Sequence, residues 1–153
     1  MILGFTGTSH GMTQRQKATV SYLFNELPLH ILHHGDCIGA DEQAHRMAMK
    51  LSAHIVVHPP NDPKKRAFCW RSSDSPEVII SLTKPYLARN RTIVENARDG
   101  IIAAPRSSQE TIRSGTWYTV RYARKIKRRI WIVFPDGTFK EESALQLGKE
   151  GIR

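Results

Sequence analysis

The sequence predicts an α/β protein: a single three-layer domain with a mostly parallel five-stranded sheet and an insertion loop over residues 59–84. Three observations predict it. Short apolar segments alternate with segments whose apolar residues repeat at helical spacing, this alternation breaks once, and the chain of 153 residues is long enough for one domain. Alternation of this kind places helices on both faces of a parallel sheet.

The first half of the chain predicts strand, helix, strand, helix, strand. The strands are expected over residues 2–6, 29–33 and 53–58. Thr13 is a candidate cap for the first helix, and the inward faces of the two helices consist of apolar residues three and four apart: Val20, Leu23, Phe24 and Leu27, then Ala40, Ala44, Met47, Ala48 and Leu51.

Residues 59–84 interrupt the pattern with prolines, a Lys-Lys-Arg run and a serine-rich stretch. A lid or binding loop and a disordered segment are the two alternatives, with one short strand over 78–82. Beyond it we expect a helix over 85–97 with Leu87, Ile93, Val94 and Ala97 inward, a strand over 100–104, a helix over 116–127 and a strand over 129–134. The domain then spans residues 1–135 and a C-terminal tail spans 136–153.

The composition sets the class of protein and of partner. The chain is 40% hydrophobic and has no apolar run of membrane-spanning length, so we expect no membrane partner. The N-terminus lacks the pattern of a signal peptide, and two cysteines without CxxC spacing indicate a reducing, cytoplasmic location. A formal charge of +9 indicates an anionic partner.

Ligands of open parallel sheets bind at the carboxyl ends of the strands, where the strand order reverses. The loops 7–12, 35–41 and 106–116 and the helix start at residue 89 fall on that rim. In the first loop, Gly7, Thr8 and Ser9 bring backbone N–H groups close to a phosphate, which is a weak signal because the loop is not GxGxxG.

The loop "GDCIGAD" follows the second strand in the same way. Gly35, Gly39 and Ala40 suit a tight turn into a helix and are expected to contact the ligand, and Asp41 either caps that helix or contacts the ligand as well. Asp36 precedes the cap, so we expect its carboxylate to point across the rim toward ribose hydroxyls or a base edge. A metal site built from His33, His34 and Cys37 is disfavoured because neighbours on a strand point to opposite faces.

The last two segments add cations and a second helix N-terminus. The binding residues expected in the first segment are Arg89, Asn90 and Arg91. One of the two arginines is expected to reach the rim and bind phosphate, although a solvated basic face remains an alternative. Ser114 is a candidate N-cap, and the N–H groups after it form a second anion site. The binding residues expected in this segment are Ser114, Gly115, Thr116 and Trp117.

These motifs resemble the SLOG superfamily, a Rossmann-like group that includes YpsA-like proteins, DNA-processing protein A and the Lonely Guy phosphoribohydrolases. "GFTGT" is similar to the YpsA-like opening, and "GDCIGADEQAH" and "ARNRTIVENAR" are similar to segments of DNA-processing protein A. "SGTWYT" resembles the Lonely Guy Pro-Gly-Gly-x-Gly-Thr loop. The match runs in order over residues 2–134, leaving out the insertion.

The resemblance implies a pocket for a nucleotide or a nucleotide derivative on the rim, often in a homo-oligomer. We expect no cofactor and no metal. The resemblance also shows a departure, because Thr119 stands where the hydrolases carry a catalytic Glu. A hydroxyl cannot replace a carboxylate in glycosidic cleavage. If the protein is an enzyme, Asp36, Asp41 or Glu95 must supply the carboxylate.

Three functions therefore remain open. The first is a sensor or sequestering protein for a nucleotide or an ADP-ribose-like ligand, which the missing acid favours. The second is a nucleoside-phosphate N-glycosidic hydrolase or transferase with a relocated carboxylate. The third is a nucleic-acid-binding protein, suggested by the basic run 121–129, although such a run at a helix end also solvates an outer face.

Overall fold

The computed structural model of the chain describes residues 1–69 and 78–143. It has one seven-stranded sheet in the order β4-β3-β2-β1-β5-β6-β7, in which β7 alone is antiparallel to its neighbour. The strands are β1 (Ile2–Gly7), β2 (Ile31–His34), β3 (His54–Val57), β4 (Val78–Ile80), β5 (Gly100–Ala104), β6 (Ile130–Val133) and β7 (Phe139–Glu142). The α/β class is confirmed, and the predicted count of five strands is wrong.

The two additional strands lie at the edges of the sheet. β4 comes from the segment predicted as an insertion and pairs in parallel with β3, and β7 pairs with β6 as a hairpin. The short strand expected over 78–82 is confirmed as β4, whereas β7 (FKEE) has no apolar alternation and carries no period-2 signal of a half-buried strand. The domain boundary expected at residue 135 therefore falls inside a hairpin, and residues 144–153 of the predicted tail lie outside the described part.

Four α-helices cover the sheet: α1 (Gln14–Glu26), α2 (Ala40–Lys50), α3 (Tyr86–Asn96) and α4 (Gly115–Lys125). Two of the candidate caps, Thr13 and Ser114, are confirmed. Thr13 forms a capping box with Gln16, and the Ser114 hydroxyl accepts a hydrogen bond from the Trp117 amide. None of the helices within residues 1–69 and 78–143 has the length and apolar character to cross a membrane.

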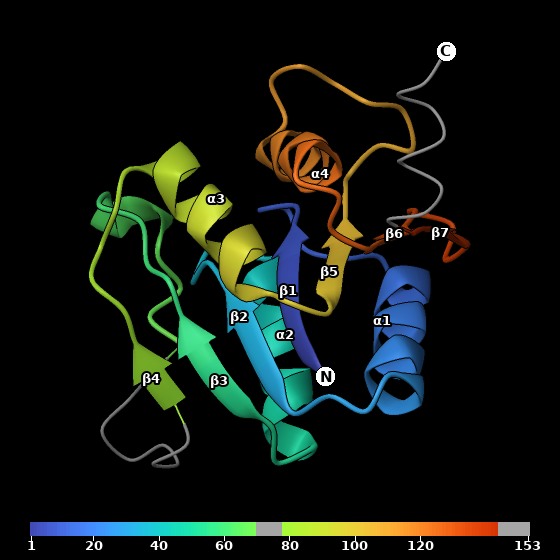
Figure 1. Cartoon of the computed structure of the whole chain (residues 1–153), viewed down its shortest axis with the longest axis horizontal. Helices are drawn as coiled ribbons and strands as arrows, with labels where there is room; N and C mark the ends of the chain where they lie inside the picture. The colour runs from blue at the N-terminus through green and yellow to red at the C-terminus, as the bar shows by residue number, and fades with distance from the viewer. Residues whose placement is uncertain (70–77, 144–153) are drawn as a thin grey trace.

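The three layers follow from alternation along the strands. In β5, Ile102 and Ala104 pack with α1 and α2, whereas Ile101 and Ala103 pack with α3 and α4. Figure 1 shows α3 in front of the sheet and α2 behind it. Of the residues predicted to face inward from α3, Leu87 is exposed, because it precedes the part of the helix that crosses the sheet, while the other three are buried.

Residues 59–69, which we call the arm, are ordered against the turn that follows β2. The Ile38 amide donates to the Lys65 carbonyl (3.3 Å), and the Ala67 amide donates to the Asp36 carbonyl (2.7 Å). A short 3-10 helix, Pro63–Lys65, shapes the arm. The described part of the predicted insertion is thus folded onto a neighbouring turn, and residues 70–77 lie outside the described residues.

Candidate ligand-binding site

A cavity of about 760 Å³ lies at the carboxyl ends of β1 and β5. The strand order reverses between these two strands, which is where ligands of open α/β sheets bind. The loops after β1 and β5 and the start of α4 supply most of its wall. The lining residues are Gly7, Thr8, Ser9, His10, Cys37, Tyr86, Arg106, Ser107, Ser108, Thr111, Arg113, Ser114, Gly115, Thr116, Trp117 and Pro135.

The loop after β1 is fixed through Thr8. The Thr8 amide donates to the Ala104 carbonyl (3.1 Å), and the Thr8 carbonyl accepts from the Ala40 amide (3.0 Å), so the loop is tied to β5 and to α2. Its last lining residue, His10, accepts from Arg106 through Nε2 (3.0 Å). The two loops that form the mouth of the cavity are therefore in direct contact.

The loop after β5 is held against the N-terminus of α4. Trp117 donates from its indole Nε1 to the Ser107 carbonyl (3.3 Å), and its backbone amide donates to Ser114 Oγ (3.2 Å). The first N–H groups of a helix have no partner inside the helix, and they carry partial positive charge. Gly115 and Thr116 present this end of α4 to the cavity.

The charge of the lining is entirely positive. Arg106 and Arg113 are exposed at the cavity, and no lining residue in the described part of the chain is Asp or Glu. The remaining polar lining groups are mainly hydroxyls, from Ser107, Ser108 and Thr111 among others. Guanidinium groups, hydroxyls and a helix N-terminus together bind anions, and phosphate in particular.

The loop after β2 contributes only Cys37 to this cavity. The Asp36 side chain is fully buried: its carboxylate pairs with Arg66 Nε (2.8 Å) and accepts from the Cys69 amide (2.9 Å). The expectation that Asp36 points across the rim is therefore wrong. A left-handed backbone at Asp36 (φ 55°) turns its side chain toward the arm, which the sequence pattern could not place.

Asp41 is also turned inward. It is not the N-cap of α2, which is Gly39, and its Oδ2 accepts instead from the amides of Gly35 and Cys37 (both 3.2 Å). Burial raises the pKa of the Asp41 carboxyl to about 6, while Arg89 and the two amides oppose that rise. Asp41 therefore holds the 35–37 turn closed and does not line the cavity.

Arg89 is buried and holds the same turn through hydrogen bonds. Its guanidinium donates to the carbonyls of Gly35 and His58 and to Cys37 Sγ (3.4 Å), and only 2% of the residue is exposed. Neither predicted arginine reaches the cavity, because Arg89 is enclosed and Arg91 is exposed on the outer part of α3. Asn90, between them, is buried and does not line the cavity either.

Glycine in the second loop is required by packing between loops. Gly39 has φ 92°, and a Cβ there would collide with the carbonyl group of Ser9. Gly35 is covered by the guanidinium of Arg89 in the same way. The space next to these glycines and Ala40 is filled by other parts of the protein, whereas the sequence predicted that a ligand would lie there.

The carboxylates considered for catalysis do not line the cavity. Glu95 lies on the last turn of α3, is exposed and accepts from the Tyr122 hydroxyl (2.6 Å). Thr119 is buried, and its hydroxyl donates to the Gly115 carbonyl of its own helix (2.9 Å). Burial raises the pKa of the Cys37 thiol, so the one cysteine at the cavity is a protonated, poor nucleophile.

Seven of the fifteen predicted binding residues line the cavity. The others belong to residues 35–39, which we call the closed turn, to the first turn of α2 or to α3. The additional lining residues come from two places. Arg106, Ser107, Ser108, Thr111 and Arg113 lie in a loop that the sequence placed on the rim, and their concentration of cations and hydroxyls was a usable signal. Tyr86 gave no such signal in the sequence, because its ring reaches Gly115 only through the packing of α3 on α4.

Most cations of the basic run 121–129 are engaged within the chain. Arg124 pairs with Glu110 and Glu142, and Arg129 pairs with Glu141. Arg121 and Arg128 donate to backbone carbonyls. Of the six cations only the two lysines, Lys125 and Lys127, are exposed, so the run mainly stabilises the packing of α4.

The histidines of β2 diverge, as expected from strand geometry. His33 pairs with His58 (Nδ1 to Nε2, 2.9 Å), and His34 on the opposite face pairs with His45 of α2 (Nε2 to Nδ1, 2.8 Å). Cys37, which was considered with them, contacts Arg89 instead. The His34–His45 pair lies beside Cys69 of the arm, a neighbour that sequence spacing does not reveal.

No protein-family model and no curated protein matches the chain, but several solved structures share its fold. The molybdenum cofactor binding protein from Rippkaea orientalis matches with a TM-score of 0.62 and 19% identity over 98% of this chain and 82% of its own. DNA processing protein A from Streptococcus pneumoniae matches with a TM-score of 0.61 and 16% identity over 85% of this chain and 49% of its own.

DNA processing protein A from Helicobacter pylori, described by its single-stranded DNA binding mode, matches with a TM-score of 0.58 and 16% identity over 97% of this chain and 72% of its own. At these identities the likeness establishes the fold. The chain therefore shares the Rossmann-like fold of a molybdenum cofactor binding protein and of two DNA processing proteins.

Proposed function

We propose that the protein binds a phosphate-bearing small molecule, a nucleotide or an ADP-ribose-like derivative, in the cavity between β1, β5 and α4, and acts by sensing or sequestering it. The observation that carries the proposal is the lining of the cavity, which consists of two exposed arginines, hydroxyls and a helix N-terminus and has no Asp or Glu among its described residues. A volume of about 760 Å³ accommodates a ligand of nucleotide size.

The lining favours binding over glycosidic hydrolysis. General acid–base catalysis by a carboxylate contributes about 10²–10⁴-fold in rate, and it requires hydrogen-bond reach of the reacting atoms. Asp36, Asp41 and Glu95 are all engaged elsewhere. We expect no release of free base from nucleoside monophosphates, measured by chromatography after long incubation, and repeated turnover would identify the protein as an enzyme.

The binding test uses AMP, ADP-ribose and inorganic phosphate in calorimetric titrations. We expect affinity to fall about 10-fold or more in Arg106→Gln and in Arg113→Gln, because a hydrogen bond to a charged group contributes about 1.5–3 kcal/mol. Arg98→Gln, an exposed arginine outside the lining, is the matched control. Equal affinity in all three variants would place the ligand elsewhere, and native mass spectrometry of protein purified from cells would show which ligand it carries.

Single-stranded DNA is the competing ligand, since one structural neighbour binds it. If DNA occupied the cavity, a short oligonucleotide would displace ADP-ribose, and its affinity would fall steeply with salt as phosphate contacts are screened. We expect weak binding that is lost near physiological salt, because four of the six cations in the basic run are internally bonded. Tight binding at that salt would favour the nucleic-acid function.

A further inference from the structure

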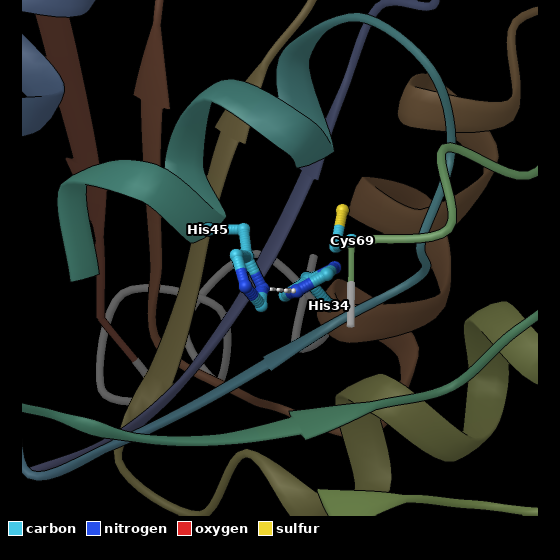
Figure 2. A group of neighbouring side chains, drawn as sticks. All are labelled: His34, His45 and Cys69. Atoms are coloured by element: carbon cyan, nitrogen blue, oxygen red, sulfur yellow. Dashed lines mark hydrogen bonds between the residues drawn. The ribbon is translucent and has the colours of Figure 1, made fainter. Parts of the chain in front are cut away.

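Three side chains with metal-binding atoms meet behind the closed turn. His34 ends β2, His45 lies on α2 and Cys69 ends the described arm, and one ligand atom from each lies within 4.8 Å of the others. Figure 2 shows the imidazoles of His34 and His45 joined by a hydrogen bond, with Cys69 beside them. We propose that His34, His45 and Cys69 bind a Zn²⁺ ion that fastens the arm to the sheet.

The chemistry of the three ligand atoms indicates which metal ion the site would bind. Two imidazole nitrogens and a thiolate suit Zn²⁺, whereas Mg²⁺ and Ca²⁺ require oxygen ligands. A site with three protein ligands leaves the fourth tetrahedral position to water. All three residues come from different elements, so an ion here would crosslink β2, α2 and the arm.

The spacing requires only a small adjustment. His34 Nε2 and His45 Nδ1 are 2.8 Å apart, which suits the hydrogen bond between them. Around a tetrahedral zinc with nitrogen bonds of 2.0–2.1 Å, the same two atoms lie about 3.3 Å apart. Metal binding would therefore replace the hydrogen bond between the two imidazoles and move the two nitrogens slightly apart.

The backbone of Cys69 is anchored near the two imidazoles. The Cys69 amide donates to Asp36 Oδ1 (2.9 Å), and Asp36 Oδ2 is held by Arg66 (2.8 Å), so the backbone that carries the sulfur is anchored beside the imidazoles. A metal ion would bind the sulfur as the thiolate and displace its proton.

Metal binding alters one hydrogen bond of the turn. His34 Nδ1 accepts from the Asp36 amide (3.0 Å), which places the ring proton of a neutral His34 on Nε2. A metal at Nε2 moves that proton to Nδ1, and the Asp36 amide must then give up its bond. The ion is thus coupled to residues 35–37, and through Cys37 to the wall of the ligand cavity.

A route for the ion is present. His45 and Cys69 line a second pocket of about 640 Å³, separate from the ligand cavity, whose other lining residues are Glu42, Arg46, Met49, Lys50, Ala67 and Phe68. A metal site needs such a path, because the ion must reach its ligands in the folded chain. The pocket brings solvent to two of the three ligands.

The test is a titration of the metal-free full chain with Co²⁺, followed by displacement with Zn²⁺. We expect one ion per chain, tetrahedral ligand-field bands in the visible spectrum and a thiolate charge-transfer band in the near ultraviolet. Cys69→Ser should lose the charge-transfer band, and His45→Gln should lose at least about 10-fold in affinity, the lower end of the effect of losing even an outer-shell partner. Circular dichroism verifies that both variants are folded.

The chain supplies matched controls. Cys37→Ser removes the other thiol among residues 1–69 and 78–143, and His33→Gln removes the adjacent histidine on the opposite face of β2; both should bind Co²⁺ like the original chain. An octahedral spectrum, an unchanged charge-transfer band in Cys69→Ser, or binding that is lost only when the surface pair His30 and His54 is replaced would overturn the proposal.

Discussion

Two neighbouring regions at the carboxyl ends of the strands are rich in glycine and charge, yet they differ in the exposure and the bonding of their charged groups. In the ligand cavity, Arg106 and Arg113 are exposed, and no described lining residue is Asp or Glu. In the closed turn, the charge of Asp36 is buried, as are the charges of Asp41 and Arg89, which bond to the turn from α2 and α3.

The difference shows that charge at a strand end has two uses. Exposed charge without a counter-charge is available to a ligand, whereas buried charge must be paired because desolvation of a lone ion is expensive. Substitutions in the closed turn should therefore change stability, and substitutions in the cavity should change affinity. The following predictions test this contrast, beginning with the largest effect.

Replacement of Arg89 by Met should destabilise the fold most. The change leaves two buried carbonyls without their donor and Asp41 without its nearby cation, and removal of one partner of a buried charged group typically costs about 3–5 kcal/mol. Urea denaturation measures the free energy of unfolding. Arg91→Gln, two residues away and exposed, is the control, with an expected change under about 0.5 kcal/mol.

Asp36→Asn should reduce stability by about 2 kcal/mol, because the amide loses the charge-assisted bonds to Arg66 and to the Cys69 backbone. The affinity for ADP-ribose should change little, since the carboxylate does not line the cavity. A large loss of affinity with unchanged stability would instead mean that Asp36 contacts the ligand.

Acid should weaken the fold through His58, which stacks on His33 beneath the closed turn. Burial, followed by the charges of His33, Arg89 and Lys84, lowers the pKa of His58 from 6.5 to about 4. A base whose pKa is lowered by folding binds a proton less readily in the folded state than in the unfolded chain. The contribution of neutral His58 to the free energy of unfolding is therefore fully present above pH 6.5 and is lost as the pH falls toward 4.

Urea denaturation at about pH 7 and about pH 4.5 should show a loss about 2 kcal/mol larger in the original chain than in His58→Gln. The variant is the necessary reference, because Asp41, with a pKa raised to about 6, has the opposite sign and stabilises the fold as the pH falls. Both measurements are made with a chelator present. Equal losses in the two proteins would mean that folding does not lower the pKa of His58.

The smallest effect on stability is expected in the cavity. Arg106→Gln and Arg113→Gln should each change the free energy of unfolding by less than about 0.5 kcal/mol, because both arginines are exposed and neither forms a salt bridge within residues 1–69 and 78–143. Their replacement should appear only in ligand affinity. A destabilisation comparable to that of Arg89→Met would remove the contrast between the two regions.

The sequence by itself determined the layers of the fold and the start of its helices. Apolar spacing located the inward faces of α1 and α2, and the hydroxyls of Thr13 and Ser114 marked two helix starts, because these are local properties of the chain. It also placed the loops after β1 and β5 on one rim, since the carboxyl ends of parallel strands lie at the same edge.

Only the tertiary structure decided which polar residues face the cavity. Asp36 and Arg89 belong to the motifs that predicted a ligand site, and both are enclosed because the arm and α3 pack onto the turn from distant parts of the sequence. The same packing brings Cys69 to His34 and His45. Motifs identify residues that need a partner, and whether that partner is a ligand, a metal or another side chain depends on long-range packing.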